Sequence, residues 1–507
     1  MRYSAAARSS TRRWIALALL TLLMAISACR RSEPSGGTLA AIQARGEITW
    51  GADLQGGEPY LWEDPNDPSK IVGFEVDIMD ALARRLGVKA RMVHYNWSNL
   101  VQSLQRGDFD IVFNGLEATP NRAAQISLSA PYFVYAETLA VKQGSAFRTL
   151  ADLRGKRIST LNQTYAHDLL KAQPLEAVLY EGNEEPYVDL VNGRVDGVLM
   201  DNVIADRYGC NRAGVTCVPT EIARGVYVAG IRKNDPELKA AIDDALAAMR
   251  QDGELERILR KAKLWDDRQA PASVAATAQV AAGGQVTAAR HFDGQQMRLF
   301  MSATLVTLAI SIAAFLLAVP LGVLLAICRV YGGPIARTAA RVYIELFRGT
   351  PVLLQLFVLY YGLAPYVNLS PMQAAIIGLG CNYGAYEAEV YRGALLALPR
   401  GQTEAAKALG LSPVQTLRHV LVPQALRLAL PPMTNDFVSL LKDSSLVSVI
   451  TVIELTKRMT IAAVDLRGWL VPGLACAAFY LALSVPLSEL ARRLERRLSR
   501  DQRPTTL

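Results

Sequence analysis

The chain has 507 residues, of which 51% are hydrophobic and 20% are charged. This length corresponds to about three or four domains, and the composition is too apolar for a disordered chain or an ordinary soluble protein. The net charge of +8 is unevenly spread: residues 38–268 carry 27 Lys and Arg against 33 Asp and Glu, and residues 269–507 carry 21 against 12. The basic excess accompanies the apolar half, which favours a membrane lipid environment over nucleic acid as the partner.

Residues 1–28 have the pattern of an export signal. Four arginines, at positions 2, 8, 12 and 13, precede the short apolar stretch 14–28. The ending Ile26-Ser27-Ala28-Cys29 resembles the lipobox of bacterial lipoproteins, which implies cleavage and lipidation at Cys29. The alternative is an uncleaved signal anchor, and either one delivers residues 38–268 to the periplasm.

Residues 38–268 predict an exported α/β domain. Short strands such as 110–113 and 198–200 alternate with amphipathic helices such as 77–86. The domain is large for one core, so we expect two lobes. Residues 269–294 are mostly small and polar without periodicity, which predicts a flexible linker.

The cysteines and histidines point to no metal site. Cys210 and Cys217 enclose six residues in a segment expected to be oxidised, which favours a local disulfide, with two free thiols as the alternative. The four histidines show no metal-ligand spacing.

Residues 295–499 predict an all-α membrane domain of about five transmembrane helices. Residues 299–328 carry no charge, and residues 349–386 form a second uncharged run, interrupted near Pro365 and Pro371, that we interpret as two spans. Residues 468–488 give another span, and 424–453 an interrupted one. Arginines gather in 329–348, 392–427 and the C-terminal tail, so these segments are expected on the cytoplasmic side of a multi-pass bacterial inner-membrane protein.

The interrupted fourth span carries two ionisable residues, Lys442 and Asp443. Such residues are costly within a membrane and are usually paired or functional. They either cancel each other or contact the solute along its transmembrane path.

Several strings in the exported domain resemble the polar amino-acid binding proteins of ABC importers, family 3. They are GFEVDIMDALARRLG (73–87), NWSNLVQSLQRGDFDI, NGLEATPNRAAQISLSAPY, LADLRGKRI and NGRVDGVLMDN, in the family's order. The resemblance implies a type II, Venus-flytrap periplasmic binding fold over residues 38–268. Lobe 1 would comprise about 46–138 and 229–265, lobe 2 about 139–228, and a small polar amino acid would bind between them.

The apolar half resembles the permease of the same importers, of the histidine and glutamine type. RGTPVLLQLF (348–357), GAYEAEVYRGAL (384–395) and GQTEAAKALGLSPVQTLRHVLVPQA (401–425) carry this resemblance. It implies a type I ABC importer permease fused to its binding protein, with a cytoplasmic coupling loop at 401–423. The residues expected to couple to the ATPase are Glu404, Ala405, Ala406 and Gly410.

The chain contains no G-x-x-x-x-G-K-[ST] motif. A separate ABC ATP-binding subunit is therefore expected, with no cofactor in this chain. Importers of this type need two permease halves, so we expect a homodimer, with a heterodimer as the alternative.

Two residues suit a zwitterionic ligand. A guanidinium grips a carboxylate bidentately, and a carboxylate pairs with an ammonium group. By resemblance, Arg122 holds the ligand's α-carboxylate and Asp201 its α-ammonium. The alternatives are a surface Arg after a turn and a helix N-cap Asp.

Two positions depart from the family pattern and leave the selectivity open. Glu117 replaces a Ser or Thr, and it either favours a cationic ligand or pairs with Arg122. Gln163-Thr164-Tyr165 replaces Gly-Thr-Thr at a helix start whose N–H groups face an anion. The remaining candidates for the ligand site are Tyr60, Trp97, Gly115, Thr164 and Tyr165.

Two other functions use related architectures. A ligand-gated channel can carry the same two-lobed domain, but its membrane segment interrupts that domain, whereas here it follows the completed domain. A dehydratase-like enzyme on this fold could use Glu117 as a general acid, yet it would need no coupling loop. We therefore expect a transporter component rather than an enzyme.

Overall fold

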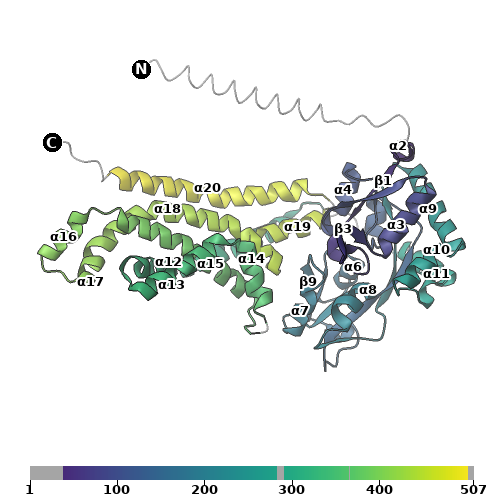
Figure 1. The fold of residues 1–507 in the computed structure, drawn as a ribbon, viewed down its shortest axis with the longest axis horizontal. Coiled ribbons are helices and arrows are strands. Elements are labelled where there is room, and N and C mark those ends of the chain that lie inside the picture. Colours follow the sequence, from purple (N-terminus) through teal and green to yellow (C-terminus); the bar gives the residue numbers. More distant parts are fainter. Residues whose placement is uncertain (1–37, 283–290, 365, 467, 501–507) are drawn as a thin grey trace, which may run out of the picture.

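The computed structural model describes residues 38–282, 291–364, 366–466 and 468–500. The export signal and Cys29 lie outside the described residues. The described chain forms an α/β binding domain (38–282) and a helical domain (291–500), which lie end to end in Figure 1.

Lobe 1 of the binding domain is built on a five-stranded sheet of order β4-β1-β5-β13-β6. Strands β4 and β5 run parallel to β1, and the returning strand β13 is antiparallel. Its strands are β1 (Glu47–Ala52), β4 (Lys89–His94), β5 (Ile111–Val112), β6 (Ser127–Leu128) and β13 (Gly230–Ile231), beside the hairpin β2 (Trp62–Asp64) and β3 (Asp67–Val72). Its helices are α2 (Thr38–Arg45), η1 (Leu54–Gly56), α3 (Phe74–Arg85), η2 (Trp97–Asn99), α4 (Leu100–Arg106), α5 (Pro120–Gln125), α9 (Pro236–Gln251) and α10 (Glu254–Lys261).

Lobe 2 is built on a second sheet of order β11-β7-β10-β8-β9, with β12 also pairing with β7. Its strands are β7 (Phe133–Lys142), β8 (Arg157–Leu161), β9 (Glu176–Tyr180), β10 (Gly197–Asp201), β11 (Val215–Cys217) and β12 (Ala223–Tyr227). Its helices are η3 (Ala151–Leu153), α6 (Tyr165–Lys171), α7 (Glu185–Val191), α8 (Asn202–Ala205) and η4 (Asp206–Cys210). A disulfide joins Cys210 to Cys217.

The predicted lobe boundary at residues 138–139 is wrong. Strand β7 begins at Phe133 and pairs along its length with β10, β11 and β12, so the whole strand belongs to the sheet of lobe 2. The chain crosses between the lobes at residues 129–132 and 228–229, which places Glu137 in lobe 2 rather than lobe 1.

The predicted flexible linker at 269–294 is wrong in its first half. Short helix η5 (Asp267–Gln269) leads into α11 (Pro271–Ala282), which packs on the binding domain. The Gln269 side chain pairs with both backbone groups of Val134, and Val274 packs on Val134, Val226 and Val228. The alanines that suggested a linker are also the strongest helix formers. Residues 283–290 lie outside the description.

The first long helix of the helical domain is α12 (Gly294–Tyr331). Asp293 precedes this helix and caps it, because its side chain accepts the backbone N–H of Gln296. The remaining helices are α13 (Pro334–Gly349), α14 (Val352–Phe357), η6 (Val358–Gly362), α15 (Pro371–Leu396), α16 (Arg400–Ala408), α17 (Pro413–Thr416), η7 (Leu417–Leu421), α18 (Val422–Asp443), η8 (Ser444–Ile450), α19 (Leu455–Asp465) and α20 (Leu470–Arg500).

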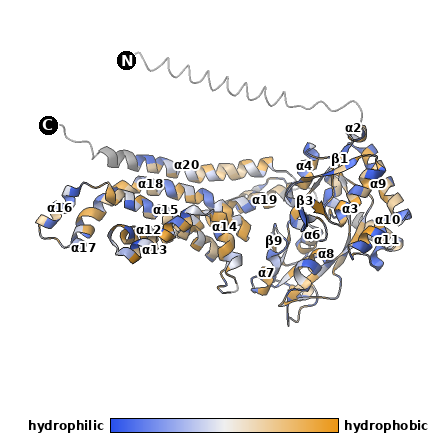
Figure 2. Cartoon of the chain, viewed as in Figure 1, coloured by the Kyte–Doolittle hydropathy of each residue, from blue (hydrophilic) through white to orange (hydrophobic). Residues whose placement is uncertain are grey.

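Among the described residues, α12 and α20 are each long and apolar enough to cross a membrane. Apolar residues cover long stretches of these helices in Figure 2. The predicted span that begins at residue 349 contains only the short helices α14 and η6, which meet α13 at an angle of 106° across Thr350 and Pro351. Counting that bent pair as one span gives three. Helices α15 and α18 have sufficient length, but charged and polar side chains interrupt their apolar surface.

Candidate functional site

The cleft between the two lobes is lined by residues that follow the carboxyl ends of strands. Asp53 follows β1, Asn114 and Glu117 follow β5, and Asp201 ends β10. Open α/β sheets place ligand sites at this edge. The full lining is Asp53, Gln55, Gly56, Tyr60, Trp97, Asn114, Gly115, Glu117, Leu161, Thr164, Glu181, Asn183, Asp201 and Ile204.

The lobes are closed on each other and leave a cavity of about 50 Å³. The Trp97 indole N–H of lobe 1 donates to the Asn162 carbonyl of lobe 2 at 3.0 Å. The Asn183 amide donates to the Gln55 carbonyl at 2.9 Å. A ligand would therefore enter only when the lobes separate and would be enclosed when they close.

Arg122 and Glu117 form a buried ion pair at the base of the cleft. The Arg122 Nη1 donates to the Glu117 Oε2 at 3.1 Å and to the Glu117 carbonyl at 2.8 Å, and Nη2 donates to the carbonyl of Gln163. Thr119 caps helix α5, and this cap fixes the backbone that presents Arg122. The Arg122 guanidinium lies 5.0 Å from the ring centroid of Trp97.

The same Glu117 carboxylate also contacts lobe 2. Its Oε2 accepts the Tyr165 backbone N–H at 2.9 Å, at the start of helix α6. Gln163 is held at φ +62°, a left-handed conformation that aims its carbonyl at Arg122. Of the two alternatives for Glu117, the structure therefore shows the pairing with Arg122.

Asp201 both caps a helix and faces the cleft. Its Oδ1 accepts the Ile204 backbone N–H at 2.9 Å and the Tyr60 hydroxyl at 3.0 Å, and the Tyr60 hydroxyl contacts the Tyr227 hydroxyl at 2.7 Å. Burial raises the pKa of Asp201, and the hydrogen bonds from Ile204 and Tyr60 oppose that shift. The helix-cap alternative is thus correct without excluding a role in ligand binding.

Further carboxyl groups are buried behind the cleft. Burial raises the pKa of Glu75 to about 7, opposed by hydrogen bonds from Tyr132 and from the Gly115 N–H. Glu137 lies opposite Asp201 in the sheet. Burial raises the pKa of Glu137 well above its ordinary value, and the charge of Glu117 adds to the shift. Burial raises the pKa of Glu117 too, against the charge of Arg122.

The structure brings most of the predicted ligand residues together. Tyr60, Trp97, Gly115, Glu117, Thr164 and Asp201 all line the cleft. Tyr165 contributes its backbone N–H, and Arg122 lies behind Glu117 rather than in the lining. The sequence interpretation missed Asp53, Gln55, Asn114, Glu181 and Asn183. Asn114 directly follows the predicted strand 110–113, and this position was a signal that could have identified it, whereas Asp53 and Glu181 follow strands β1 and β9, which only the structure shows.

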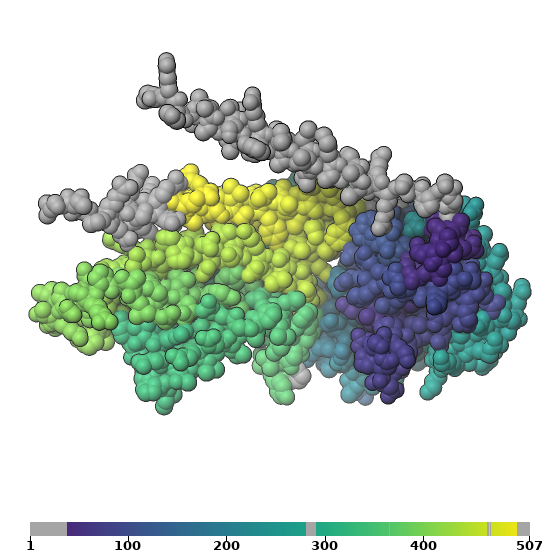
Figure 3. Space-filling model, turned by 45° about the horizontal axis from the view of Figure 1, so that its top comes forward, coloured from purple at the N-terminus to yellow at the C-terminus, as the bar shows by residue number. Residues whose placement is uncertain are grey.

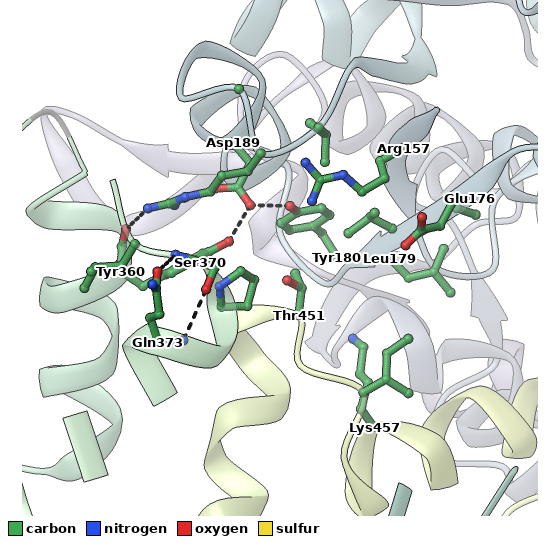
Figure 4. A pocket seen from close by; sticks show the side chains of 18 of the residues that line it. Arg157, Glu176, Leu179, Tyr180, Asp189, Tyr360, Ser370, Gln373, Thr451 and Lys457 are labelled. Atoms are coloured by element: carbon green, nitrogen blue, oxygen red, sulfur yellow. Dashed lines mark hydrogen bonds and ion pairs between the residues drawn. The ribbon is translucent and has the colours of Figure 1, made fainter. Parts of the chain in front are cut away.

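A second polar site lies where lobe 2 meets the helical domain, around a cavity of about 410 Å³ (Figure 4). Arg194 donates to Asp189 at 2.9 Å within lobe 2, and across the junction to the Tyr360 carbonyl at 3.0 Å and Asn368 at 2.9 Å. The Tyr360 hydroxyl donates to Asp189 at 2.8 Å, and the Arg194 guanidinium lies 3.9 Å from the Tyr360 ring centroid. We call Asp189, Arg194, Tyr360 and Asn368 the docking cluster.

One carboxylate connects this junction to the ligand cleft. Glu181 follows β9, lines the cleft and accepts the Ser98 hydroxyl of lobe 1 at 2.7 Å. Its other oxygen accepts the Lys457 ammonium group of α19 at 3.2 Å. Glu181 therefore contacts lobe 1 and the helical domain at the same time in the closed conformation.

The helical domain holds a polar cavity of its own, of about 580 Å³. Arg348, Asp436 and Asp443 are its charged lining residues, and the Tyr383 hydroxyl donates to Asp443 at 2.7 Å. Of the two residues predicted along the solute path, Asp443 lines this cavity, whereas Lys442 is exposed and outside the lining. The two do not form an ion pair in the described structure.

Two family models match the chain, one in each part. The model of bacterial extracellular solute-binding proteins, family 3, matches residues 49–263, and that of binding-protein-dependent transport system inner membrane components matches residues 318–500. The chain is 41% identical over 204 residues to the glutamine transport system permease protein of Escherichia coli K12, covering 93% of that protein and 39% of this chain. This chain belongs to that family of inner membrane transport components.

One further relative and one solved structure are similar to parts of the chain. The permease domain resembles the L-cystine transport system permease protein of Bacillus subtilis, with 37% identity over 196 residues, 84% of that protein and 38% of this chain. Among solved structures, an ancestral arginine-binding protein bound to glutamine is 30% identical to this chain, with a TM-score of 0.41. The match covers 44% of this chain and 99% of the chain of that protein. The chain is a fused solute-binding protein and permease, and thus a transporter component rather than an enzyme.

In this fused permease, the predicted coupling residues lie at the end of the helical domain farthest from the binding domain (Figures 1 and 3). Glu404 and Ala405 are exposed on α16, and Ala406 is buried. Gly410 has φ +77°, a conformation that an L-residue adopts only with strain, so a glycine suits this turn.

Proposed function

We propose that this chain is the substrate-binding and membrane-spanning subunit of an ABC importer for polar amino acids in the bacterial inner membrane. The observation that supports it best is the direct contact of lobe 2 with the permease domain through the docking cluster. A solute released from the cleft would meet the membrane domain of the same polypeptide. The binding domain is periplasmic in this proposal, tethered by a lipid on Cys29 or by a retained leader.

A separate ABC ATP-binding subunit drives the transport. Its proposed contact is the loop at 401–423, with Glu404 and Ala405 exposed at the surface and Gly410 forming the turn. Since one chain supplies one permease half, the working assembly is a homodimer with two binding domains. Asp443 is the proposed contact along the solute path, because it lines the polar cavity of the helical domain.

Replacing Gly410 by alanine is expected to uncouple the ATPase from solute capture. An L-residue in the left-handed conformation costs roughly 1–2 kcal/mol, and the turn between α16 and α17 relieves that strain by moving. We expect solute-stimulated ATP hydrolysis to fall at least fivefold in proteoliposomes that hold the complex with its ATP-binding subunit and a mixture of the twenty amino acids.

The matched control is Gly401→Ala on the same helical segment. Gly401 has no positive φ, and its Cβ position meets open space. The control is expected to keep full stimulation. Equal stimulation in Gly410→Ala and Gly401→Ala would argue against docking of the ATPase at this turn.

A further inference from the structure

An ion pair between Glu181 and Lys457 separates the ligand cleft from the cavity at the junction of lobe 2 and the helical domain, which we call the junction cavity. Glu181 lines the cleft, and the residue before it, Tyr180, lines the junction cavity. Lys457 of α19 also lines the junction cavity (Figure 4), and its ammonium group donates to Glu181 Oε1 at 3.2 Å. The two compartments are therefore adjacent, and this pair stands between them.

The two partners of the pair differ in their exposure to solvent. The Lys457 side chain is only 5% exposed, whereas that of Glu181 is 47% exposed. Glu181 is the carboxylate that neutralises Lys457 in the described part of the chain. A buried cation without a counter-ion is costly, while a half-exposed carboxylate can turn to water. Lys457 therefore requires a carboxylate more than Glu181 requires Lys457.

Lobe closure holds Glu181 in its position beside Lys457. Its Oε2 accepts the hydroxyl of Ser98 in lobe 1 at 2.7 Å, while its Oε1 accepts from Lys457. When the lobes separate, Ser98 moves away with lobe 1 and Glu181 loses this donor. The docking cluster does not include the pair, so lobe 2 stays on the helical domain while the pair opens.

An α-amino acid can insert into this pair without leaving a charge unpaired. Its carboxylate matches the Lys457 ammonium group, and its own ammonium group matches the Glu181 carboxylate. The backbone that presents Lys457 is fixed at the start of α19, where the Glu454 side chain accepts the N–H groups of Thr456 and Lys457, both at 2.8 Å. The pair is thus complementary to a zwitterion.

The junction cavity has the size and the polar groups of a small-solute site. Its volume of about 410 Å³ lies within the range of about 300–1,000 Å³ that is typical of ligand pockets. Uncharged polar side chains of the helical domain line it: Asn368, Ser370, Gln373 and Thr451. Of the other charged lining residues, Arg194 pairs with Asp189, and Arg157 stands opposite Glu176 in the register of β8 and β9. Lys457 differs from them, because its counter-ion lies in the cleft.

We propose that Glu181 and Lys457 form a transfer site for the amino acid between the cleft and the permease domain. When the lobes separate, the solute's carboxylate replaces that of Glu181 on Lys457, and its ammonium group turns to Glu181. The solute then leaves the cleft bound at the junction cavity instead of returning to the periplasm. The inference rests on the proposed importer function and adds to it a binding site at the domain junction.

The ratio of solute taken up to ATP hydrolysed tests this site. A transfer site acts after capture and docking, so its loss lets the solute escape while solute-stimulated ATP hydrolysis continues. Proteoliposomes hold the full-length protein with its ABC ATP-binding subunit and receive a saturating, labelled mixture of the twenty amino acids. Lys457→Gln is expected to lower the ratio at least fivefold. The concentration of the mixture that half-stimulates ATP hydrolysis is expected to change less than twofold.

Asn368→Ala is the matched variant for docking, because Asn368 lines the same cavity and joins lobe 2 without carrying a charge. It is expected to lower uptake and solute-stimulated ATP hydrolysis in the same proportion and so to keep the wild-type ratio. Glu181→Gln removes the other charge of the pair and is expected to lower the ratio as Lys457→Gln does. The melting temperature of each variant shows whether it is folded.

A wild-type ratio in folded Lys457→Gln protein would overturn the transfer site, whether uptake and hydrolysis are both normal or fall together as in Asn368→Ala. If Lys457→Gln does not fold, the ratio in Glu181→Gln decides in the same way. ATP hydrolysis without uptake by the wild-type protein would instead contradict the importer function itself.

Discussion

Replacing Arg194 by alanine is expected to lower solute uptake at least tenfold while ligand affinity changes less than twofold. Arg194 is only 6% exposed and joins Asp189 to the Tyr360 carbonyl and the Asn368 side chain. Its removal leaves Asp189 buried without its cation, and breaking a buried ion pair in this way costs about 3–5 kcal/mol. Part of this cost falls on lobe 2, which holds both residues of the ion pair, whereas the loss of the hydrogen bonds to Tyr360 and Asn368 weakens the docked state alone.

Uptake into proteoliposomes and calorimetric ligand binding are the two measurements for Arg194→Ala. Arg224→Ala is the control, since it removes an exposed ion pair with Glu221, 2.6 Å long, on the same lobe. Such pairs contribute about 0–1 kcal/mol, and the control is expected to transport normally. Undiminished uptake by a folded Arg194→Ala protein would show that the docking cluster is not used in transport.

Asn368, on the permease side of the docking cluster, gives a second test of whether the cluster is used in transport. Asn368 accepts from Arg194 and donates to the Asn192 carbonyl at 2.6 Å. Because Asn368 lies outside lobe 2, Asn368→Ala weakens docking without touching the fold of the binding domain. Its effect on uptake should not add to that of Arg194→Ala, because residues that share one network are coupled.

Replacing Asp201 by asparagine is expected to weaken ligand binding at least 100-fold. The amide oxygen still caps the Ile204 N–H and still accepts the Tyr60 hydroxyl, so helix α8 and the closed cleft are retained. Only the negative charge is lost. A hundredfold loss corresponds to about 2.7 kcal/mol, within the range measured for hydrogen bonds to charged groups together with partial burial.

Titration calorimetry with a panel of polar amino acids measures the effect of Asp201→Asn on ligand affinity. Asp152→Asn is the matched control, because Asp152 also accepts backbone N–H groups, those of Arg148 and Thr149, but is exposed and outside the cleft. Wild-type affinity in a folded Asp201→Asn variant would remove Asp201 from the binding site and leave it as a helix cap alone.

Most of the predicted ligand residues line the cleft in the structure. These residues lie next to strands, in sequence strings that resemble those of the family. Glu117 follows β5 and Asp201 ends β10, so their positions on the cleft edge followed from the strand pattern and the family resemblance. The strand pattern and the family resemblance did not decide which residue pairs with Arg122. The sequence leaves open whether Glu117 turns toward Arg122, and it gives no sign that the Tyr165 N–H of lobe 2 reaches the same oxygen.

The docking cluster left no local signal. Asp189 and Arg194 lie at the end of α7 and just after it, a spacing that is common for exposed pairs, but both are buried where lobe 2 meets the helical domain. Tyr360 stands in an uncharged run that predicts a membrane span, and Asn368 stands in the turn predicted to follow that span. These contacts join residues 166 to 174 positions apart and depend on how the two domains meet, which no sequence periodicity indicates.

Helix α11 and the segment around Thr350 show two cases in which composition alone gave the wrong local structure. Small residues without periodicity suggested a linker, but Val274 and Gln269 find partners on β7 and β12 and fold the segment onto the binding domain. The uncharged run at 349–364 predicts a span, but it contains only the short helices α14 and η6, and the chain turns by 106° at Thr350 and Pro351, where the run begins. Hydropathy reports burial in an apolar environment and not the direction of the chain.

Transport into sealed vesicles tests the central claim most directly. Vesicles hold this protein and its ABC ATP-binding subunit with ATP on the subunit's side, and they receive labelled polar amino acids on the side of the binding domain. We expect at least one solute to accumulate above its external concentration, only with ATP, and not in the Asp201→Asn protein. ATP hydrolysis without accumulation of any of these solutes would contradict the assignment of this chain as their importer.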